Sequence, residues 1–207
     1  MTDKRQFVYL DSPVQHRVGD CIVYSAGINH EWSFDEVMKK CRVYAFDPSM
    51  EMPNHTRCER IRVDNRGLSD HNYVTEEGWT KRTLEFVYKM LLPIHGERII
   101  DHLQIDIEST KWDVLIQLIE SGMLAKARQL AVEFHLPESY ETIEEYGRFV
   151  NMVKSVEKAG MIRFDSKYNP WCRTILKTLI DNYNGSNAFK IAFYQILPDF
   201  KQTVNPK

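Results

Sequence analysis

Short apolar runs alternate with amphipathic segments along most of the chain. Residues 21–25 and 42–46 are apolar runs bounded by turn residues, which is typical of buried strands. The segment between them opens with the capping-box pattern Ser33-x-x-Glu36. Its apolar residues recur at the spacing of one helix face, namely Phe34, Val37, Met38 and Cys41. A strand, a helix and a strand within about 30 residues predict a βαβ unit.

The same alternation continues towards the carboxyl end. Further strands are expected near residues 59–63, 99–107, 130–135, 161–165 and 189–197. Helices are expected over residues 80–92 with Pro93 as the stop, from Trp112 to Gly122, and from a second capping box at Thr142 to Gly160. This order predicts a Rossmann-like α/β fold, with a mainly parallel sheet and helices on both faces. We expect one domain over residues 1–207, with residues 1–18 as a lead-in.

The ends of the first two predicted strands carry features of a ligand site, because parallel sheets bind ligands at the carboxyl ends of their strands. The first strand runs into the turn Ser25-Ala26-Gly27, where glycine allows a tight turn and a close ligand. No full G-x-G-x-x-G pattern follows, so an ordinary strand-to-helix turn is an alternative. Asp47 lies about 20 residues later, where a carboxylate can accept hydrogen bonds from both ribose hydroxyls. An Asp-Pro turn is the alternative for Asp47.

Acidic residues gather at the ends of two later strands. Asp106 and Glu108 end the fourth strand, and Glu133 and His135 end the fifth. The period of two in a strand places each pair on one face. If these strands are neighbours, the acids repel one another unless a cation is present, and Mn²⁺ or Mg²⁺ suits Asp106, Glu133 and His135 as ligands. Alternatively, Glu108 caps the next helix and His135 forms a local hydrogen bond.

Composition narrows the classes of protein. The net charge of -2 gives no support to a binder of nucleic acid or of anionic membranes, and no apolar stretch is long enough to span a bilayer. The four cysteines include no CxxC pair, so a zinc knuckle is not expected. Cys21 and Cys41 fall on apolar positions and are expected as small buried hydrophobes. Disulfides and the oligomeric state are left open.

A series of motifs in conserved order carries a family resemblance. The motifs are Gly19–Ile28, Trp32–Asp35, Val43–Pro48, Gly67–Asp70, and Ile105–Glu108 with Trp112. The series resembles the methyltransferase-domain family related to FkbM-type O-methyltransferases. The resemblance implies a class I methyltransferase fold that binds S-adenosylmethionine, with a seven-stranded sheet whose last strand is antiparallel. It also implies that Gly27 lies under the methionine moiety, Asp47 holds the ribose, Ser69 and Asp70 lie near the adenine, and Asp106 lies near the transferred methyl group.

Within this family the chain is similar to the invertebrate galactose methyltransferases that need a divalent cation and act on N-glycan cores. That similarity implies a sugar acceptor and a place in the Golgi lumen, for a domain that has lost the membrane anchor of such enzymes. If the chain is not a glycan methyltransferase domain, a cytoplasmic protein is expected. The chain departs from the family pattern at Ser109, where many relatives have glycine, and at Lys111, where an acid is common.

The leading hypothesis is therefore an S-adenosylmethionine-dependent O-methyltransferase that acts on a hydroxyl, with a sugar as the expected acceptor. In one version a metal held by Asp106, Glu133 and His135 lowers the pKa of the acceptor hydroxyl. In the other version His135 or Glu108 is the general base. The alternative from another class is a catalytically silent module that binds S-adenosylmethionine or a partner protein. A nicotinamide-dependent oxidoreductase is disfavoured, because the glycine pattern for a pyrophosphate is missing.

Overall fold

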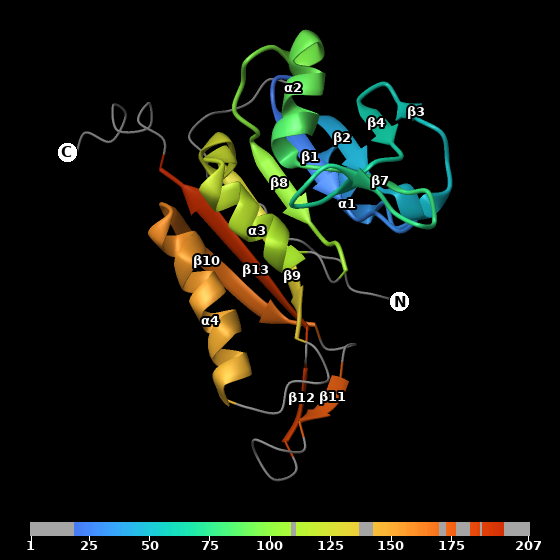
Figure 1. Cartoon of the computed structure of the whole chain (residues 1–207). Helices are drawn as coiled ribbons and strands as arrows, with labels where there is room; N and C mark the ends of the chain where they lie inside the picture. Colours follow the sequence, from blue (N-terminus) through green and yellow to red (C-terminus); the bar gives the residue numbers. More distant parts are fainter. Residues whose placement is uncertain are drawn as a thin grey trace, which may run out of the picture.

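An eight-stranded sheet organises the chain (Figure 1). We describe it from a computed structural model over residues 19–108, 111–136, 143–169, 173–176, 183–186 and 188–196. The strands lie in the order β10-β13-β9-β8-β1-β2-β4-β3. Strand β1 has β2 on one side and β8 on the other, so the chain reverses its direction of travel across the sheet at β1. Such a reversal is the place where parallel sheets bind ligands.

Five neighbouring strands of the sheet are parallel. They are β4 (Ile61–Asp64), β2 (Arg42–Phe46), β1 (Ile22–Ala26), β8 (His102–Ile105) and β9 (Gln129–His135). The last strand, β13 (Ala188–Gln195), runs antiparallel between β9 and β10 (Met161–Tyr168), which confirms the predicted antiparallel strand. The sheet has one strand more than expected, because β3 (His55–Cys58) forms an antiparallel hairpin with β4 at the edge.

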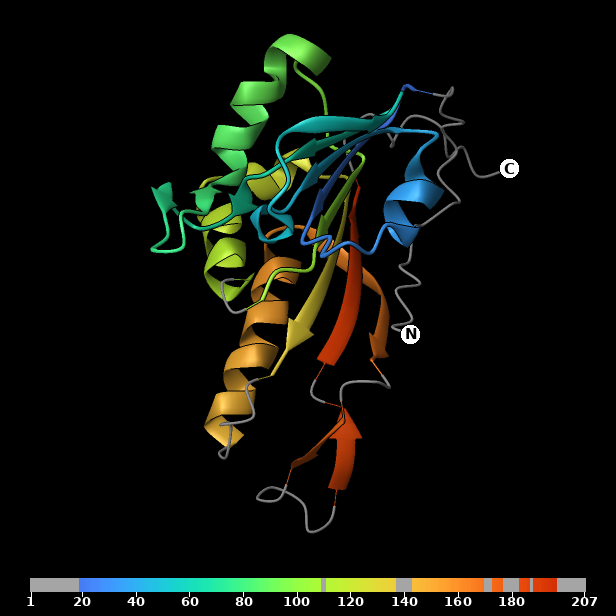
Figure 2. The same cartoon turned by 90° about the vertical axis from the view of Figure 1, so that its right-hand side faces the viewer.

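Helices cover both faces of the sheet, but unequally (Figure 2). One face is covered by α2 (Leu84–His95), α3 (Lys111–Glu120) and α4 (Ile143–Lys158). The other face carries the short helix α1 (Ser33–Met38). Because side chains alternate along a strand, Tyr24 of β1 joins the core under the three helices, whereas Val23 joins the core under α1. All five residues of β1 are therefore buried, which explains its continuous apolar sequence.

Helix boundaries differ from the prediction at three places. The capping box at Ser33 does not form, because α1 has Trp32 at its N-cap without a side-chain cap, and Val37 is 73% exposed rather than packed. Residues 80–82 form a strand instead of a helical turn, and α2 begins after Thr83, whose hydroxyl accepts the Phe86 N–H at 3.2 Å. Helix α2 also continues through Pro93 to His95, so it ends later than predicted; the proline removes one helical hydrogen bond, and only two helical residues follow it.

Several short elements were not expected. A small sheet joins β5 (Gly67–Leu68), β7 (Thr80–Arg82) and β6 (Tyr73–Val74), and 3-10 helices cover Pro48–Met50 (η1) and Met123–Lys126 (η2). A hairpin of β11 (Arg173–Leu176) and β12 (Tyr183–Ser186) projects beyond the sheet, at the edge where β9 ends (Figures 1 and 2). Elements of two to four residues are too short to give a periodic signal. The second capping box, at Thr142, and residues 1–18 lie outside the described residues.

A disulfide joins Cys21 to Cys41, with their Cα atoms 4.7 Å apart. Both residues are buried as expected, but the sequence left their bonding open. The bond ties the entry of β1 to the entry of the neighbouring β2 across a sequence separation of 20 residues. Cys58 is a free and exposed cysteine. In the part of the chain that the structure describes, no helix has the length and apolar character to span a bilayer.

The disulfide should contribute measurably to stability. Replacing Cys21 and Cys41 together by serine should lower the free energy of unfolding by about 3 kcal/mol, because the cross-link restricts the unfolded chain. Urea unfolding measures this difference, and adding a reductant to the unaltered chain should reproduce it. Cys58→Ser is the matched control and should unfold like the unaltered chain. Equal stability of the oxidised and reduced chains would contradict the assignment.

Candidate active site

A cleft of about 760 Å³ lies at the carboxyl ends of β1, β2, β8 and β9. The small sheet β5-β7-β6 forms one of its walls. This volume is in the range of ligand sites, and the cleft lies where the strand order reverses. Six of the residues singled out in the sequence line it, namely Gly27, Asp47, Asp106, Glu108, Glu133 and His135.

Gly27 lies where the ends of β1 and β8 meet. Its φ is 84°, and a Cβ at this position would be 1.9 Å from the carbonyl oxygen of Asp106. The Asp106 N–H donates to the Ala26 carbonyl at 2.9 Å, which holds the two backbones together. The glycine is therefore required by a protein contact, in addition to any ligand contact. Ser25 and Ala26 are buried in β1 and support this turn without lining the cleft.

Asp47 fixes the end of β2 against the turn after β1. Its Oδ1 accepts hydrogen bonds from the N–H (2.9 Å) and the hydroxyl (2.6 Å) of Ser49, and its Oδ2 accepts the Asn29 N–H at 2.7 Å. A carboxylate offers about four acceptor positions, so Asp47 retains room for a further donor. Its side chain is buried but lines the cleft. The Asp-Pro turn, which was the alternative for Asp47, is also present, because Asp47 caps η1.

The small sheet contributes a cation beside Asp47 that the sequence reasoning missed. Burial lowers the pKa of Lys81, and the carboxylates of Asp47 and Glu77 partly oppose that shift. The Lys81 ammonium lies 5.5 Å from the centre of the Trp79 ring. A Cβ on Gly67 would lie 2.8 Å from the Lys81 side chain, so that glycine makes room for it. Lys81 was missed because residues 80–82 were expected to start a helix.

Ser69 and Asp70 lie outside the lining of this cleft. The Ser69 hydroxyl donates to Asp70 Oδ1 at 2.9 Å, and the Asp70 carboxylate pairs with His71 Nδ1 at 3.0 Å. Ser69 is fully buried and its N–H donates to the Arg82 carbonyl at 2.8 Å, which links it to β7. These contacts support the small sheet, and the expected contact with an adenine stays a prediction.

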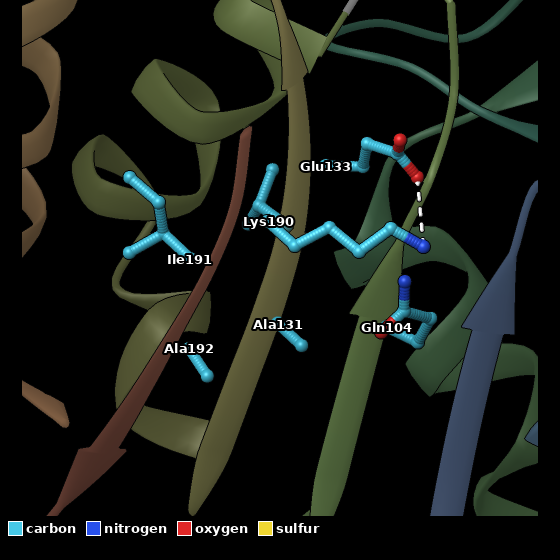
Figure 3. A pocket seen from close by; sticks show the side chains of 7 residues that line it. Gln104, Ala131, Glu133, Lys190, Ile191 and Ala192 are labelled. Carbon is cyan, nitrogen blue, oxygen red and sulfur yellow. Dashed lines mark ion pairs between the residues drawn. The ribbon is translucent and has the colours of Figure 1, made fainter. Parts of the chain in front are cut away.

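We call Asp106, Glu108, Glu133 and His135 the acidic end of the cleft. Within it, the Glu133 carboxylate has two direct partners. Its Oε2 lies 3.2 Å from the Lys190 ammonium, and its Oε1 accepts the Asn169 amide at 2.9 Å. Burial raises the pKa of Glu133, but the Asn169 hydrogen bond and the Lys190 charge outweigh burial and bring the pKa below its ordinary value. Figure 3 shows the Lys190 side chain crossing β9 towards Glu133, beside Gln104. The hollow in that view holds only about 10 Å³, too small for a substrate.

His135 lies between a buried cation and an exposed carboxylate. Its Nδ1 is 2.9 Å from the Lys111 ammonium and 3.2 Å from Glu108 Oε2. Lys111 is the first residue of α3 and its side chain is 1% exposed, whereas the side chain of Glu108 is 77% exposed. The Nε2 of His135 lies 3.7 Å from Glu133 Oε1, and Asp106 lines the same part of the cleft and helps to lower the pKa of Glu133. The structure thus brings Asp106, Glu133 and His135 together, as expected.

The residues at this end do not fit the expected metal ion. Among the described residues, no three His, Cys, Asp or Glu side chains are grouped so that they could hold a metal. The expected ligands Asp106, Glu133 and His135 are near one another, but ammonium groups already contact two of them. A divalent cation would have to displace or closely approach these positive charges, which Coulomb repulsion opposes. The predicted Mn²⁺ or Mg²⁺ site is therefore not supported by the structure.

Two side chains of the acidic end had no role in the sequence reasoning. Lys190 lies directly opposite Glu133 in the register of β13 and β9. A lysine inside the apolar run of 189–197 was the only signal for it. Asn169 follows β10, and nothing in the sequence marked it.

Comparisons with known proteins show similarity to methyltransferases. A family model described as a methyltransferase domain matches residues 4–178. The human "Probable methyltransferase-like protein 24" is 31% identical over 192 residues, which cover 86% of this chain and 51% of that protein. The protein of the same name from Rattus norvegicus is 30% identical over 128 residues, 59% of this chain and 35% of that protein. The chain thus spans about half the length of the human relative.

A solved structure shows the same fold. The methyltransferase FkbM from Methylobacillus flagellatus has a TM-score of 0.51 at 13% identity, covering 90% of this chain and 47% of that chain. Together with the strand order, this likeness confirms the predicted Rossmann-like class I methyltransferase fold.

The contact at Gly27 yields a prediction of stability. Gly27→Ala should lower the free energy of unfolding by at least about 2 kcal/mol more than Gly78→Ala, because only the first adds a Cβ against backbone atoms. Gly78 is a matched control, since its φ of 85° imposes a similar backbone cost and no atom lies within 4 Å of its Cβ position. Urea unfolding of both variants measures the difference. Equal losses would show that β8 does not approach β1 as described.

Proposed function

Because the chain belongs to the methyltransferase-domain family, we propose that it binds S-adenosylmethionine in the cleft and transfers the methyl group to a hydroxyl oxygen of a sugar. The observation that carries this proposal is the placement of Asp47 and of the acidic end in one cleft at the reversal of strand order. Asp47 has the position and the remaining acceptor capacity for a ribose hydroxyl. The close approach of Gly27 to the backbone of Asp106 keeps the end of β8 beside the end of β1.

The charge of the cleft suits this cofactor better than a dinucleotide. S-adenosylmethionine supplies a methyl group on a positively charged sulfonium, so no metal is needed to activate the donor. Negative charge exceeds positive charge along the cleft, and this excess would favour a cation over a pyrophosphate. The lining has two lysines, Lys81 and Lys190, and five carboxylates, namely Asp47, Glu77, Asp106, Glu108 and Glu133. The turn after Gly27 continues with Asn29 and His30 at positive φ instead of the glycines that a pyrophosphate loop uses.

The acidic end is the proposed acceptor site. Catalysis requires an acceptor oxygen held in line with the methyl group and a group that takes its proton. Asp106, Glu133 and His135 offer hydrogen-bond acceptors and donors within a small region, which suits the several hydroxyls of a sugar. His135 and Glu108 are the candidates for the proton acceptor. No step is assigned to a metal ion, since the residues present do not fit one.

The disulfide between Cys21 and Cys41 supports a place in an oxidising compartment, because disulfides rarely persist in the cytosol. A lumenal compartment such as the Golgi is where glycan acceptors are found, so the proposed substrate class and the disulfide agree.

A labelled-methyl transfer assay against a panel of glycans tests the function directly. We expect transfer to at least one glycan, and we expect it to persist in EDTA without stimulation by Mn²⁺. Binding of the cofactor without transfer to any acceptor would favour the alternative of a catalytically silent module. Transfer that depends on Mn²⁺ would instead restore the metal-assisted version.

Asp47→Ala should weaken the binding of S-adenosylmethionine by about 1–3 kcal/mol, because charge-assisted hydrogen bonds are lost. Isothermal titration calorimetry measures the affinity, and circular dichroism checks that the variant is folded. Asp113→Ala is the matched control, since Asp113 is exposed on α3, lies outside the lining of the cleft and should leave the affinity unchanged. An equal loss of affinity at Asp113 and at Asp47 would remove Asp47 from the ribose site.

Asp106→Ala should reduce the rate of methyl transfer by at least about 100-fold, the usual scale for a group that assists proton transfer or orients the acceptor. The fold should persist, because the contacts of Asp106 with Ala26 and Gly27 involve only its backbone. The labelled-methyl assay measures the rate, and urea unfolding measures stability. A rate near that of the unaltered chain would show that the acceptor site lies elsewhere.

A further inference from the structure

Lys111 occupies an unfavourable position for a cation. Its side chain is 1% exposed, and burying an ammonium group costs free energy unless specific partners compensate it. It is also the first residue of α3, where the helix dipole disfavours positive charge. Helix stability therefore does not account for a lysine here. Its contact with His135 Nδ1 at 2.9 Å, inside the proposed acceptor site, indicates a role in that site.

The contact with Lys111 fixes the protonation of the His135 ring. A lysine ammonium has three donors and no acceptor, so Nδ1 must be the nitrogen that accepts. A neutral imidazole then carries its proton on Nε2. Glu108 Oε2 lies 3.2 Å from the same Nδ1, but it cannot receive a hydrogen bond from an unprotonated nitrogen. Glu108 is instead 4.0 Å from the Lys111 ammonium, where opposite charges attract.

Lys190 is the second lysine of the acidic end and forms an ion pair with Glu133. Its side chain is 12% exposed, and β13 places it directly opposite Glu133 on the neighbouring strand. The ammonium contacts one carboxylate oxygen, and the Asn169 amide donates to the other. Both lysines therefore engage atoms that were expected to bind a metal ion.

We propose that Lys111 and Lys190 are the fixed cations of the acidic end, in place of a divalent metal ion, and that Lys111 holds His135 with its proton on Nε2. This inference rests on the proposed function only in its consequence for methyl transfer. His135 then donates a hydrogen bond from Nε2 to the acceptor oxygen and does not act as the base. The hydroxyl proton passes to Glu108, whose exposed side chain has to turn from the Nδ1 side of the ring to reach it. The oxygen forms its bond to carbon as the carbon–sulfur bond breaks, with the electron pair going to sulfur.

The protonation of His135 can be measured without any activity. In the chain labelled with ¹⁵N-histidine, long-range ¹H–¹⁵N spectra at neutral pH distinguish protonated from unprotonated ring nitrogens. The His135 signals are assigned by their loss in His135→Asn. We expect an unprotonated Nδ1 and a protonated Nε2 in the unaltered chain. A proton on Nδ1, with or without one on Nε2, would overturn the proposal, because Glu108 and not Lys111 would then be its partner.

Variants of Lys111 separate positioning from a merely structural role. Lys111→Met should give a mixture of the two neutral forms of His135 and lower kcat by about tenfold or more, whereas Lys111→Arg should keep both near the unaltered chain. Lys89→Met, on the exposed face of α2, is the matched control and should change neither measurement. If Lys111→Met leaves the His135 signals unchanged in a folded chain, Lys111 does not set the ring protonation.

A titration with Mn²⁺ alone, followed by electron paramagnetic resonance, tests the other half of the proposal. We expect the signal of free Mn²⁺ to remain at every ratio of protein to metal. Binding that disappears in Glu133→Gln would overturn the replacement of the metal by lysines. The expected protonation and metal results, with no methyl transfer to any acceptor, would remove the proposed function and keep this inference. Methyl transfer by a chain whose His135 carries a proton on Nδ1 would keep the proposed function and remove this inference.

Discussion

The approach of two backbones at Gly27 is the constraint on which the cleft depends. The turn after β1 can reach β8 only because no Cβ stands between Gly27 and the Asp106 carbonyl. The Gly27 N–H also donates to the Phe46 carbonyl at 3.0 Å, so the end of β2 is held by the same residue. Three strand ends therefore converge on one glycine. Asp47 and Asp106 lie on either side of it, which places the two halves of the candidate site within reach of one ligand.

Charge is the second constraint. Carboxylates at one edge of a parallel sheet repel one another, and the sequence predicted a metal ion that offsets this repulsion. The structure places ammonium groups there instead, from α3 and from β13. Lys190 comes from a strand that is distant from Glu133 in the sequence, and only the antiparallel insertion of β13 beside β9 sets them opposite each other. A reading of strand ends one at a time could not find that pairing.

The sequence predicted the features that depend on burial on both faces of a strand. The runs at 21–25 and 42–46 became β1 and β2 with shifts of at most a residue, because such strands leave a continuous apolar signal. It did not predict the small sheet at Gly67–Arg82, whose strands are too short to show a period. The sequence predicted the residues of the acidic end but not the lysines that balance their charge, since Lys111 and Lys190 come from other elements. The bond between Cys21 and Cys41 depends on the pairing of β1 with β2, which the spacing of the cysteines does not reveal.

The two ends of the cleft are built in different ways, and this difference limits what the fold says about function. The end at Asp47 is held by backbone groups, namely the N–H groups of Asn29 and Ser49 and the turn at Gly27. The position of this end is therefore set by the course of the backbone itself. The end at Glu133 is built by side chains, with Lys190, Asn169 and Lys111 as its partners. Side chains can change while the strands stay in place, so one fold can serve different acceptors. The family therefore constrains the cofactor more tightly than the acceptor, and the acceptor has to be argued from the lysines, acids and imidazole of this chain.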